Sequence, residues 1–337
     1  MKHFAFDDQI ASQSEAVRSV LTSSDEIPQL DCRRPVILAG IGTSLHAAKV
    51  AGYWIRELSG NRIHPVIVET HDYALHGAIQ AEDQIIVISH RGNKHFPRLL
   101  LERAKQAGAL TISVSGRGTL NPGGDIVLRT CADEQASTHS VSYTTALAVL
   151  ARLVAALIGN SASSLFAGRL NTIPSAIEKT LAYPFPSDIL PRLINKEPLF
   201  LTGFGIDALC VTEAALKIKE GAYLWAEGMS IELALHGTPA VFEPRHAAII
   251  AVPDIDDGGR TKAFLTMLKE LHIEAVTLGT GDCDLTFAEV DYLLRPFVSI
   301  LPLQRLVAEL ARHRGSNPDT TRSDVEPYKS AISRIRL

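Results

Sequence analysis

Short apolar runs alternate with amphipathic stretches along the first half of the chain. The runs cover 35–44, 64–70, 84–90, 110–116 and 125–130, and helical patterns cover 5–22, 45–58, 72–79, 97–107 and 142–158. Runs of this length predict buried strands, and the spacing of apolar residues between them predicts helices. Strands that enter helices through glycine-containing turns are typical of an α/β fold with a parallel sheet.

The same order of elements begins again in the second half. The stretch PLFLTGFGIDALCVTEAALKIKE repeats PVILAGIGTSLHAAKVAGYWIRE, and Gly203 takes the position of Gly40, an offset of 163 residues. A later strand and helix, residues 247–271, repeat an earlier pair with an offset of 164. Two pairs of similar segments that are separated by nearly the same number of residues predict an internal duplication.

A chain of 337 residues is long enough for two domains. Three prolines in LAYPFPSDILP indicate a linker between them. We therefore predict two tandem domains, each a parallel sheet flanked by helices in a three-layer sandwich. The expected division is a helical lead-in at 1–34, a first domain at 35–172, a linker at 173–197, a second domain at 198–315 and a C-terminal tail at 316–337.

Composition and charge exclude several classes of protein. The 33 Lys and Arg against 37 Asp and Glu leave a net charge of −4, without the basic footprint of a nucleic-acid-binding protein. The N-terminus carries acids where a signal peptide needs an apolar core, and no apolar stretch has the ~20 residues of a membrane span. We expect a cytoplasmic protein with no nucleic-acid or membrane partner, no cofactor and no metal. The four cysteines are too far apart for a zinc site or a disulfide framework: Cys32, Cys131, Cys210 and Cys283.

Two loops of the first repeat are suited to an anion. The turn with Gly42, Thr43 and Ser44 leads from a strand into a helix, so backbone N–H groups and hydroxyls point at one place. It lacks the third glycine of a dinucleotide-binding turn. A turn that only packs helix against strand fits the spacing equally well. The loop after the strand at 84–90 offers polar and cationic groups for a second phosphate contact, or is a solvated basic loop: Ser89, His90, Arg91, Gly92 and Lys94.

The second repeat carries charged residues on a helix. Glu213, Lys217 and Glu220 are spaced i, i+4, i+7, which places them on one helical face. Such a stripe is usually solvated, but the surrounding residues are rich in Ala, Leu and Ile and predict burial. Burial would raise the pKa of a carboxylate toward the range of a general base. His236 lies in a loop before a predicted strand at 240–244, and Lys329 lies near the end of the chain.

Together these residues resemble the double SIS (sugar isomerase) family, and most of all the isomerase half of glucosamine-6-phosphate synthase and stand-alone phosphosugar isomerases, deaminases and deglycases. The resemblance implies that 35–172 and 198–315 are both SIS domains with a flavodoxin-like or Rossmann-like sandwich. It spans about Pro35 to Ala331. The motifs that carry it are Gly42-Thr-Ser, Ser89 with Gly92, Ser142-Tyr-Thr144, Glu213-x-Ala-Leu-Lys-x-Lys-Glu220, Ala226-Glu227, His236-Gly237, Asn317-Pro-Asp319 with Arg322, and Lys329.

The resemblance also implies a role for each residue. Glu220 would move a proton between C1 and C2 of an open-chain sugar, and Lys329 would form a Schiff base with the ketose carbonyl. His236 would assist ring opening, reaching into the neighbouring subunit of a homodimer. Glu213 and Lys217 would line the same site. The remaining residues would bind the phosphosugar: Thr43, Ser44, Ser89, Ser142 and Thr144.

Three departures from the family pattern bear on the substrate. Arg91 and Lys94 stand where the family has a Ser and a Thr, so the phosphate loop keeps its affinity for an anion but changes its geometry. Thr238 lengthens the histidine loop by one residue, and Val141 replaces a frequent Lys. With no glutaminase segment in this sequence, glutamine is not the expected nitrogen donor. The function expected is aldose–ketose isomerisation or aminosugar-phosphate deamination or deglycation; the alternative is a non-catalytic phosphosugar-binding regulator.

Overall fold

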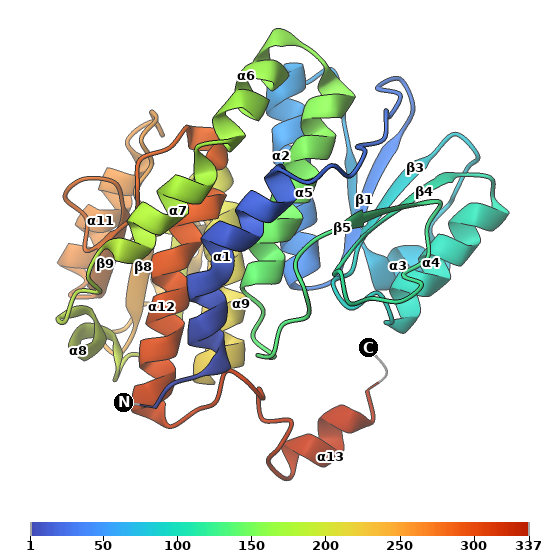
Figure 1. Ribbon diagram of the computed structural model, residues 1–337. Helices are drawn as coiled ribbons and strands as arrows, with labels where there is room; N and C mark the ends of the chain where they lie inside the picture. Colours follow the sequence, from blue (N-terminus) through green and yellow to red (C-terminus); the bar gives the residue numbers. More distant parts are fainter. Residues whose placement is uncertain (1, 336–337) are drawn as a thin grey trace. The chain divides into compact units, whose positions relative to one another are not determined.

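The computed structural model describes residues 2–335 and contains two parallel sheets of five strands each (Figure 1). The first has the order β2-β1-β3-β4-β5 and the second β10-β9-β8-β6-β7, so both follow one connection pattern. The predicted α/β class is confirmed. The strands are β1 (Val36–Gly40), β2 (Val66–Glu69), β3 (Gln84–Ile88), β4 (Leu110–Ser115), β5 (Ile126–Arg129), β6 (Leu199–Gly203), β7 (Ala226–Ser230), β8 (Ala247–Ala251), β9 (Glu274–Gly279) and β10 (Leu285–Thr286).

Helices occupy the segments between the strands and both ends of the described chain. The α-helices are α1 (Ala5–Leu21), α2 (Thr43–Ser59), α3 (Thr70–His76), α4 (His95–Gln106), α5 (Val141–Ile158), α6 (Ser161–Leu170), α7 (Ile173–Ala182), α8 (Ile189–Leu193), α9 (Ile206–Ala222), α10 (Ile231–Leu235), α11 (Arg260–Glu270), α12 (Pro296–Arg314) and α13 (Tyr328–Ser333). Two short 3₁₀ helices are η1 (Thr238–Val241) and η2 (Tyr292–Leu294).

The chain forms two compact units that do not follow its order. The first-sheet unit comprises 13–134, 141–174 and the residues from 325 onward. The second-sheet unit comprises the residues up to 12, 135–140 and 175–324. The predicted division into five consecutive segments stays a prediction. Its linker, 173–197, contains helices α7 and α8, and the last two residues of its tail lie outside the described part of the chain.

In the first-sheet unit the central strands are buried on both faces, as parallel strands must be when helices cover them. Every residue of β1 and β3 is buried. Ile37 and Ile85 pack toward α3 and α4, where Leu100 is fully buried. Helices α2 and α5 pack against each other, and α2 also packs against β1.

Helix α5 is apolar almost all round, which is expected for a helix inside a core. Among residues 2–335 it is the one helix long and apolar enough to cross a membrane by length and composition. However, 78% of that stretch is buried inside the protein, as in the core helix of a globular unit.

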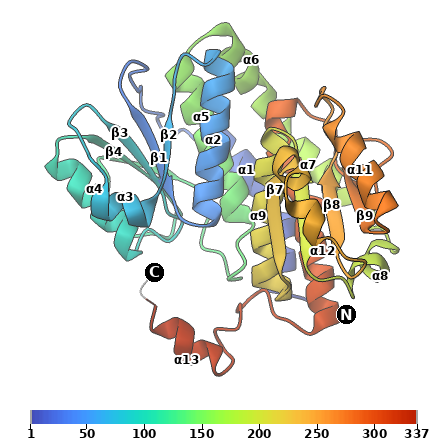
Figure 2. The same ribbon diagram turned by 180° about the vertical axis from the view of Figure 1, so that it is seen from behind.

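The core of the second-sheet unit has the same construction. Phe200 and Ile250 from adjacent strands pack against Phe264 and Leu268 of α11. Helix α9 packs against α12 and against β6 and β7 (Figure 2). Because α9 is enclosed in this way, its charged residues Asp207, Glu213 and Lys217 are carried into the interior.

One strand predicted from the sequence is wrong. Residues 240–244 do not pair with a sheet; part of the segment forms the 3₁₀ helix η1 instead. Pro239 at its start has a fixed φ and no N–H group, which suits the first turn of a helix and does not suit a sheet ladder.

Candidate functional site

Helix α9 brings the three charged residues of the second-sheet unit together. The exposed fraction of Glu213 and of Lys217 is 1%, so the burial predicted for this face is real. The Lys217 ammonium lies 2.5 Å from a carboxylate oxygen of Glu220 and 3.5 Å from one of Glu213. The side chain of Glu220 is 31% exposed.

This cluster holds one cation between two carboxylates. Burying an ammonium or a carboxylate costs several kcal/mol unless an opposite charge is in contact, and Lys217 contacts both acids. Glu213 is enclosed, whereas Glu220 combines the ion pair with access to solvent. Glu220 is therefore the member of the cluster that a ligand can reach and that can exchange a proton with it.

His236 lies at the end of α10, in the same unit. Its side chain is 73% exposed, and Nε2 is 2.9 Å from Oε1 of Glu232, one helical turn earlier. The other oxygen of Glu232 is 3.0 Å from Nε of Arg260. The structure thus pairs His236 with an acid of its own helix rather than with a residue of α9.

In the first-sheet unit, the turn at Gly42 begins helix α2. Gly42 has a φ of 55°, and Thr43 and Ser44, both partly exposed, form the first turn of the helix. A Cβ on Gly40 would lie 2.4 Å from the backbone carbon of Ser44, so only glycine lets the strand approach the helix so closely. Helix α2 therefore begins with the positive end of its dipole at two residues that carry hydroxyls, a start that suits an anion.

The loop from Ser89 to Lys94 follows β3 and is held by the backbone. Ser89 is buried, its N–H donates to the carbonyl of Val114, and its carbonyl accepts from the N–H of Gly92. Burial lowers the pKa of His90, although Glu134 and Asp133 oppose the shift. Arg91 is exposed. The loop is thus a fixed frame that presents Arg91 to solvent.

The predicted substrate groups of α5 are engaged inside the unit. Glu134 caps the helix, accepting from the N–H of Val141 at 2.7 Å and from the hydroxyl of Ser142 at 2.5 Å. The Thr144 hydroxyl is fully buried and donates to Gln13 at 3.0 Å. A ligand would have to replace these bonds to bind either hydroxyl. Lys329 lies on α13 of the same unit and is exposed.

Sequence reasoning missed a buried ion cluster at the second glycine turn. Asp207 and Arg295 are each 1% exposed, and Nε of Arg295 donates to Asp207 at 2.9 Å. Arg295 also donates to the carbonyl of Val252 and lies 3.3 Å from Asp254. Burial raises the pKa of Asp207 to about 6, against the opposing charge of Arg295. Asp207 was visible in the sequence, but its partner lies 88 residues away.

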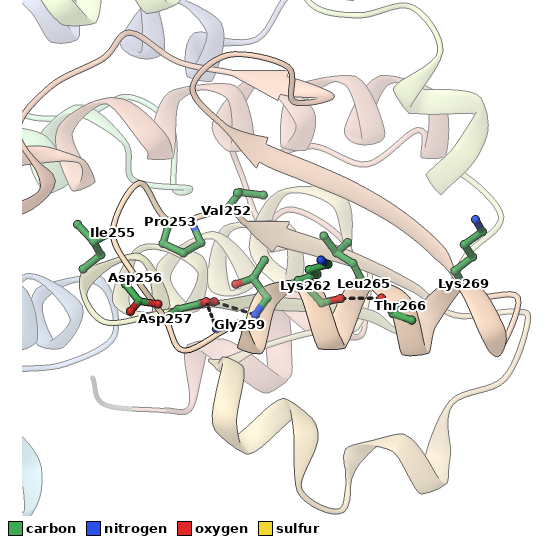
Figure 3. Close-up of a pocket in the computed structure, with 11 residues that line it drawn as sticks. Val252, Pro253, Ile255, Asp256, Asp257, Gly259, Lys262, Leu265, Thr266 and Lys269 are labelled. Carbon is green, nitrogen blue, oxygen red and sulfur yellow. Dashed lines mark hydrogen bonds between the residues drawn. The ribbon is translucent and has the colours of Figure 1, made fainter.

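A cavity of about 550 Å³ adjoins the loop between β8 and α11 (Figure 3). It lies at the position that corresponds, by the repeat offset, to the basic loop of the first-sheet unit. The Asp257 carboxylate accepts from the N–H groups of Gly259 and Thr261, at 2.9 and 2.7 Å. Burial raises the pKa of Asp257, but the bonds from Thr261 and Gly259 outweigh it and leave the pKa below its usual value. The start of α11 is therefore already occupied by a carboxylate of the protein itself.

Comparison with known proteins agrees with these observations. Residues 29–158 match the family model described as "SIS domain". The chain is 28% identical over 344 residues to a glutamine–fructose-6-phosphate aminotransferase [isomerizing] of Thermococcus kodakarensis, covering 95% of this chain and 55% of that protein. The chain thus spans about half the length of the curated relatives it matches.

Solved structures show the same fold. The C-terminal domain of glucosamine-fructose-6-phosphate aminotransferase from Francisella tularensis superposes with a TM-score of 0.84 at 19% identity, covering 94% of this chain and 98% of that one. Glucosamine-6-phosphate deaminase from Thermotoga maritima has a TM-score of 0.73 at 18% identity, covering 94% and 95%. The resemblance to the SIS family is confirmed over residues 29–158, the part of the chain that matches the family model.

Proposed function

We propose that this protein is an enzyme that acts on a phosphosugar, either interconverting aldose and ketose or removing or exchanging an amine at C1 or C2. The observation that carries the proposal is the cluster on α9, where a buried lysine holds a solvent-accessible carboxylate. The printed names of the relatives, which refer to fructose 6-phosphate and glucosamine 6-phosphate, support the substrate class.

In the proposed mechanism, the Glu220 carboxylate takes the proton from one of C1 and C2 and returns it to the other. The Lys217 ammonium, 2.5 Å from a carboxylate oxygen of Glu220, holds that side chain in place while Glu220 acts as the base. Lys329 forms an imine with the ketose carbonyl, which makes the neighbouring C–H more acidic. His236 assists ring opening in the neighbouring subunit of a cytoplasmic homodimer.

The phosphate is assigned to the first-sheet unit. The start of α2, with Gly42, Thr43 and Ser44, supplies a helix N-terminus and hydroxyls. The loop at 89–94 adds the Arg91 guanidinium, which binds an anion in a fixed planar geometry. The corresponding loops of the second-sheet unit hold the carboxylates of Asp207 and Asp257, which supports a single phosphate position in the chain.

Proton exchange tests the role of Glu220. The purified protein is incubated in deuterated water with fructose 6-phosphate, glucosamine 6-phosphate and glycated-amine 6-phosphates, and exchange at C1 and C2 is followed by NMR. We expect Glu220→Gln to slow the exchange by at least about a hundredfold, since an amide cannot act as the base. Glu270→Gln, the same change at an exposed position on α11, should leave the rate unchanged.

Exchange that survives Glu220→Gln would refute the assignment of the base. A protein that binds one of these compounds without any exchange would instead be a non-catalytic phosphosugar-binding regulator, which is the alternative that the unusual Arg91 and Lys94 favour.

Binding measurements test the phosphate loop. Arg91→Ala should lower the affinity for fructose 6-phosphate by about tenfold, the effect expected from the loss of one charge-assisted contact. The weak affinity for fructose should stay unchanged. Arg98→Ala, an exposed arginine on the following helix, is the matched control. Equal weakening of both sugars by Arg91→Ala would exclude the loop from the phosphate site.

A further inference from the structure

The C-terminal end of α9 is joined to the chain that follows α12. The last carbonyls of a helix have no partners within it and must find them elsewhere. The hydroxyl of Ser316 donates to the carbonyl of Gly221 at 2.7 Å, and Nε of Arg314 donates to that of Ala222 at 3.1 Å. The helix that carries Glu220 is therefore capped by the segment that leads to the C-terminal tail.

Tyr223 stands at the centre of this junction, three residues after Glu220. Its hydroxyl donates to the carbonyl of Asn317 at 3.0 Å and accepts from the N–H groups of Arg322 and Asn317, at 3.0 and 3.3 Å. The Arg322 guanidinium lies 4.4 Å from the centre of the Tyr223 ring. One side chain thus binds both ends of the turn 317–322.

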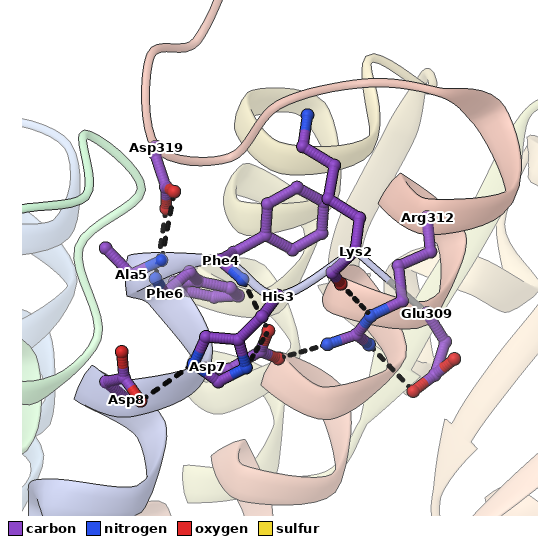
Figure 4. Close-up of polar contacts among 10 residues, drawn as sticks. All are labelled: Lys2, His3, Phe4, Ala5, Phe6, Asp7, Asp8, Glu309, Arg312 and Asp319. Atoms are coloured by element: carbon purple, nitrogen blue, oxygen red, sulfur yellow. Dashed lines mark hydrogen bonds and ion pairs between the residues drawn. The ribbon is translucent and has the colours of Figure 1, made fainter.

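The far side of this turn is anchored as well. The Asp319 carboxylate accepts from the N–H groups of Ala5 and Phe6, at 2.9 and 3.0 Å, and so caps α1 (Figure 4). The carbonyl of Asp319 accepts from the N–H of Ser137. Seven residues before Asp319, the Arg312 guanidinium donates to the Asp7 carboxylate and to the carbonyl of Lys2, as the same figure shows. All of these contacts lie within the second-sheet unit, so the turn is fixed to the body of that unit.

The backbone of the junction is strained. Of six residues other than glycine with a positive φ in the described chain, three lie here: Tyr223 at 54°, Thr321 at 48° and Arg322 at 64°. A positive φ is particularly unfavourable for a β-branched residue such as Thr321. Strain of this kind persists where the surroundings over-determine a conformation, and it concentrates at sites that need accurate positioning.

We propose that Tyr223 is a positioning residue for Lys329, an inference that rests on the proposed function, in which Lys329 forms the imine. Lys329 follows Arg322 by seven residues, which confine its backbone to within about 24 Å of the point where Tyr223 holds the chain. The hydroxyl of Tyr223 fixes that point next to the end of the helix that carries Glu220. A short tether with a fixed origin raises the effective concentration of the amine at the carbonyl that it attacks.

Tyr223→Phe tests this role, because it retains the ring beneath Arg322 and removes only the hydroxyl. Imine formation is measured by borohydride trapping of Lys329 with fructose 6-phosphate, and turnover by proton exchange. We expect trapping and kcat to fall by about tenfold or more while the Kd of inorganic phosphate stays within about twofold. Hydrogen exchange in peptides covering 316–324 should rise at least about tenfold, with peptides of α9 before Glu220 unchanged.

Tyr292→Phe is the matched control. The Tyr292 hydroxyl also makes two backbone hydrogen bonds in the second-sheet unit: it donates to the carbonyl of Phe204 and accepts from the N–H of Ile206. This variant should retain trapping and the exchange pattern of 316–324, and equal melting temperatures of the two variants would show that lost stability is not the cause.

The outcomes distinguish a failure of the imine role of Lys329 from a failure of the positioning role of Tyr223. A wild-type protein that traps no imine would refute the proposed role of Lys329, and the positioning role with it, whatever the variant does. A wild-type protein that traps the imine, with Tyr223→Phe equal to it in trapping and kcat, would overturn the positioning role alone. Unchanged hydrogen exchange at 316–324 in Tyr223→Phe would also overturn it.

Discussion

Arg295→Met is the substitution with the largest expected effect on the second-sheet unit. The substitution keeps most of the volume and the unbranched shape of the side chain but removes the guanidinium that contacts Asp207, Asp254 and the carbonyl of Val252. Asp207 is 1% exposed, so its carboxylate would be left charged and unpaired in the interior.

The magnitude follows from the burial of each partner. Removing one partner of a buried ion pair costs about 3–5 kcal/mol, whereas the contact with Asp254, which is 33% exposed, contributes at most about 1 kcal/mol. Protonation of Asp207 reduces this cost, because the pKa of Asp207 is already raised to about 6 and the carboxylate can take up a proton. We therefore expect a loss of about 3 kcal/mol at pH 7 and a clearly smaller loss at pH 5, where Asp207 is mostly neutral in both proteins.

Urea denaturation, followed by circular dichroism at both pH values, measures this loss in the full-length protein. Arg305→Met is a matched control, since Arg305 is also on α12, lies 5.6 Å from the Phe185 ring and donates to a backbone carbonyl, but has no buried carboxylate partner. A loss below about 1 kcal/mol for Arg295→Met, or a double variant with Asp207→Asn that is no more stable than the single variant, would refute the reasoning.

Two further outcomes are expected. Gly92→Ala should cost about 2–4 kcal/mol in urea denaturation, because φ is +60° and a Cβ would lie 2.4 Å from Thr119, whereas Gly60→Ala, with the same φ and open space, should cost only about 1 kcal/mol. Equal losses of stability in the two variants would show that the loop around Gly92 rearranges to accommodate the added methyl group, which would contradict this prediction. The raised pKa of Asp207 favours its neutral form in the folded state, so its contribution to stability is complete below about pH 4 and is lost as the pH rises through about 6. The difference between 3.8 and about 6 corresponds to about 3 kcal/mol. The free energy of unfolding of the wild type should fall by that amount relative to Asp207→Asn between pH 4 and pH 7, and parallel pH curves for the two proteins would contradict the shift.

Local sequence patterns were sufficient to predict much of the fold. The apolar runs predicted β1, β3 and β4 because parallel strands between helix layers are buried on both faces and need continuous apolar residues. The glycine turns were readable because a tight entry from strand to helix leaves no room for a Cβ, as Gly40 shows. The stripe of Glu213, Lys217 and Glu220 was readable because helical spacing alone places these residues side by side.

Other features depended on tertiary packing. The sequence predicted a strand at 240–244, where Pro239 and the missing sheet partner produce a 3₁₀ turn. It also treated Ser142 and Thr144 simply as ligand groups, whereas Glu134 and Gln13 bind them within the first-sheet unit. The partners of Ser142 and Thr144 are set by packing, whereas Pro239 is a local signal that was already present in the sequence.

The sequence by itself determined the strands and helices from α1 to α5 and the charged face of α9, since backbone sterics and apolar periodicity act over a few residues. Only the tertiary structure decided which polar groups meet across long stretches of chain. Arg295 finds Asp207 across 88 residues, and the Tyr223 hydroxyl finds Asn317 and Arg322 across 94 and 99. Such pairs form because packing of the apolar surfaces brings distant segments together, and a buried polar group then binds the partner that lies within reach.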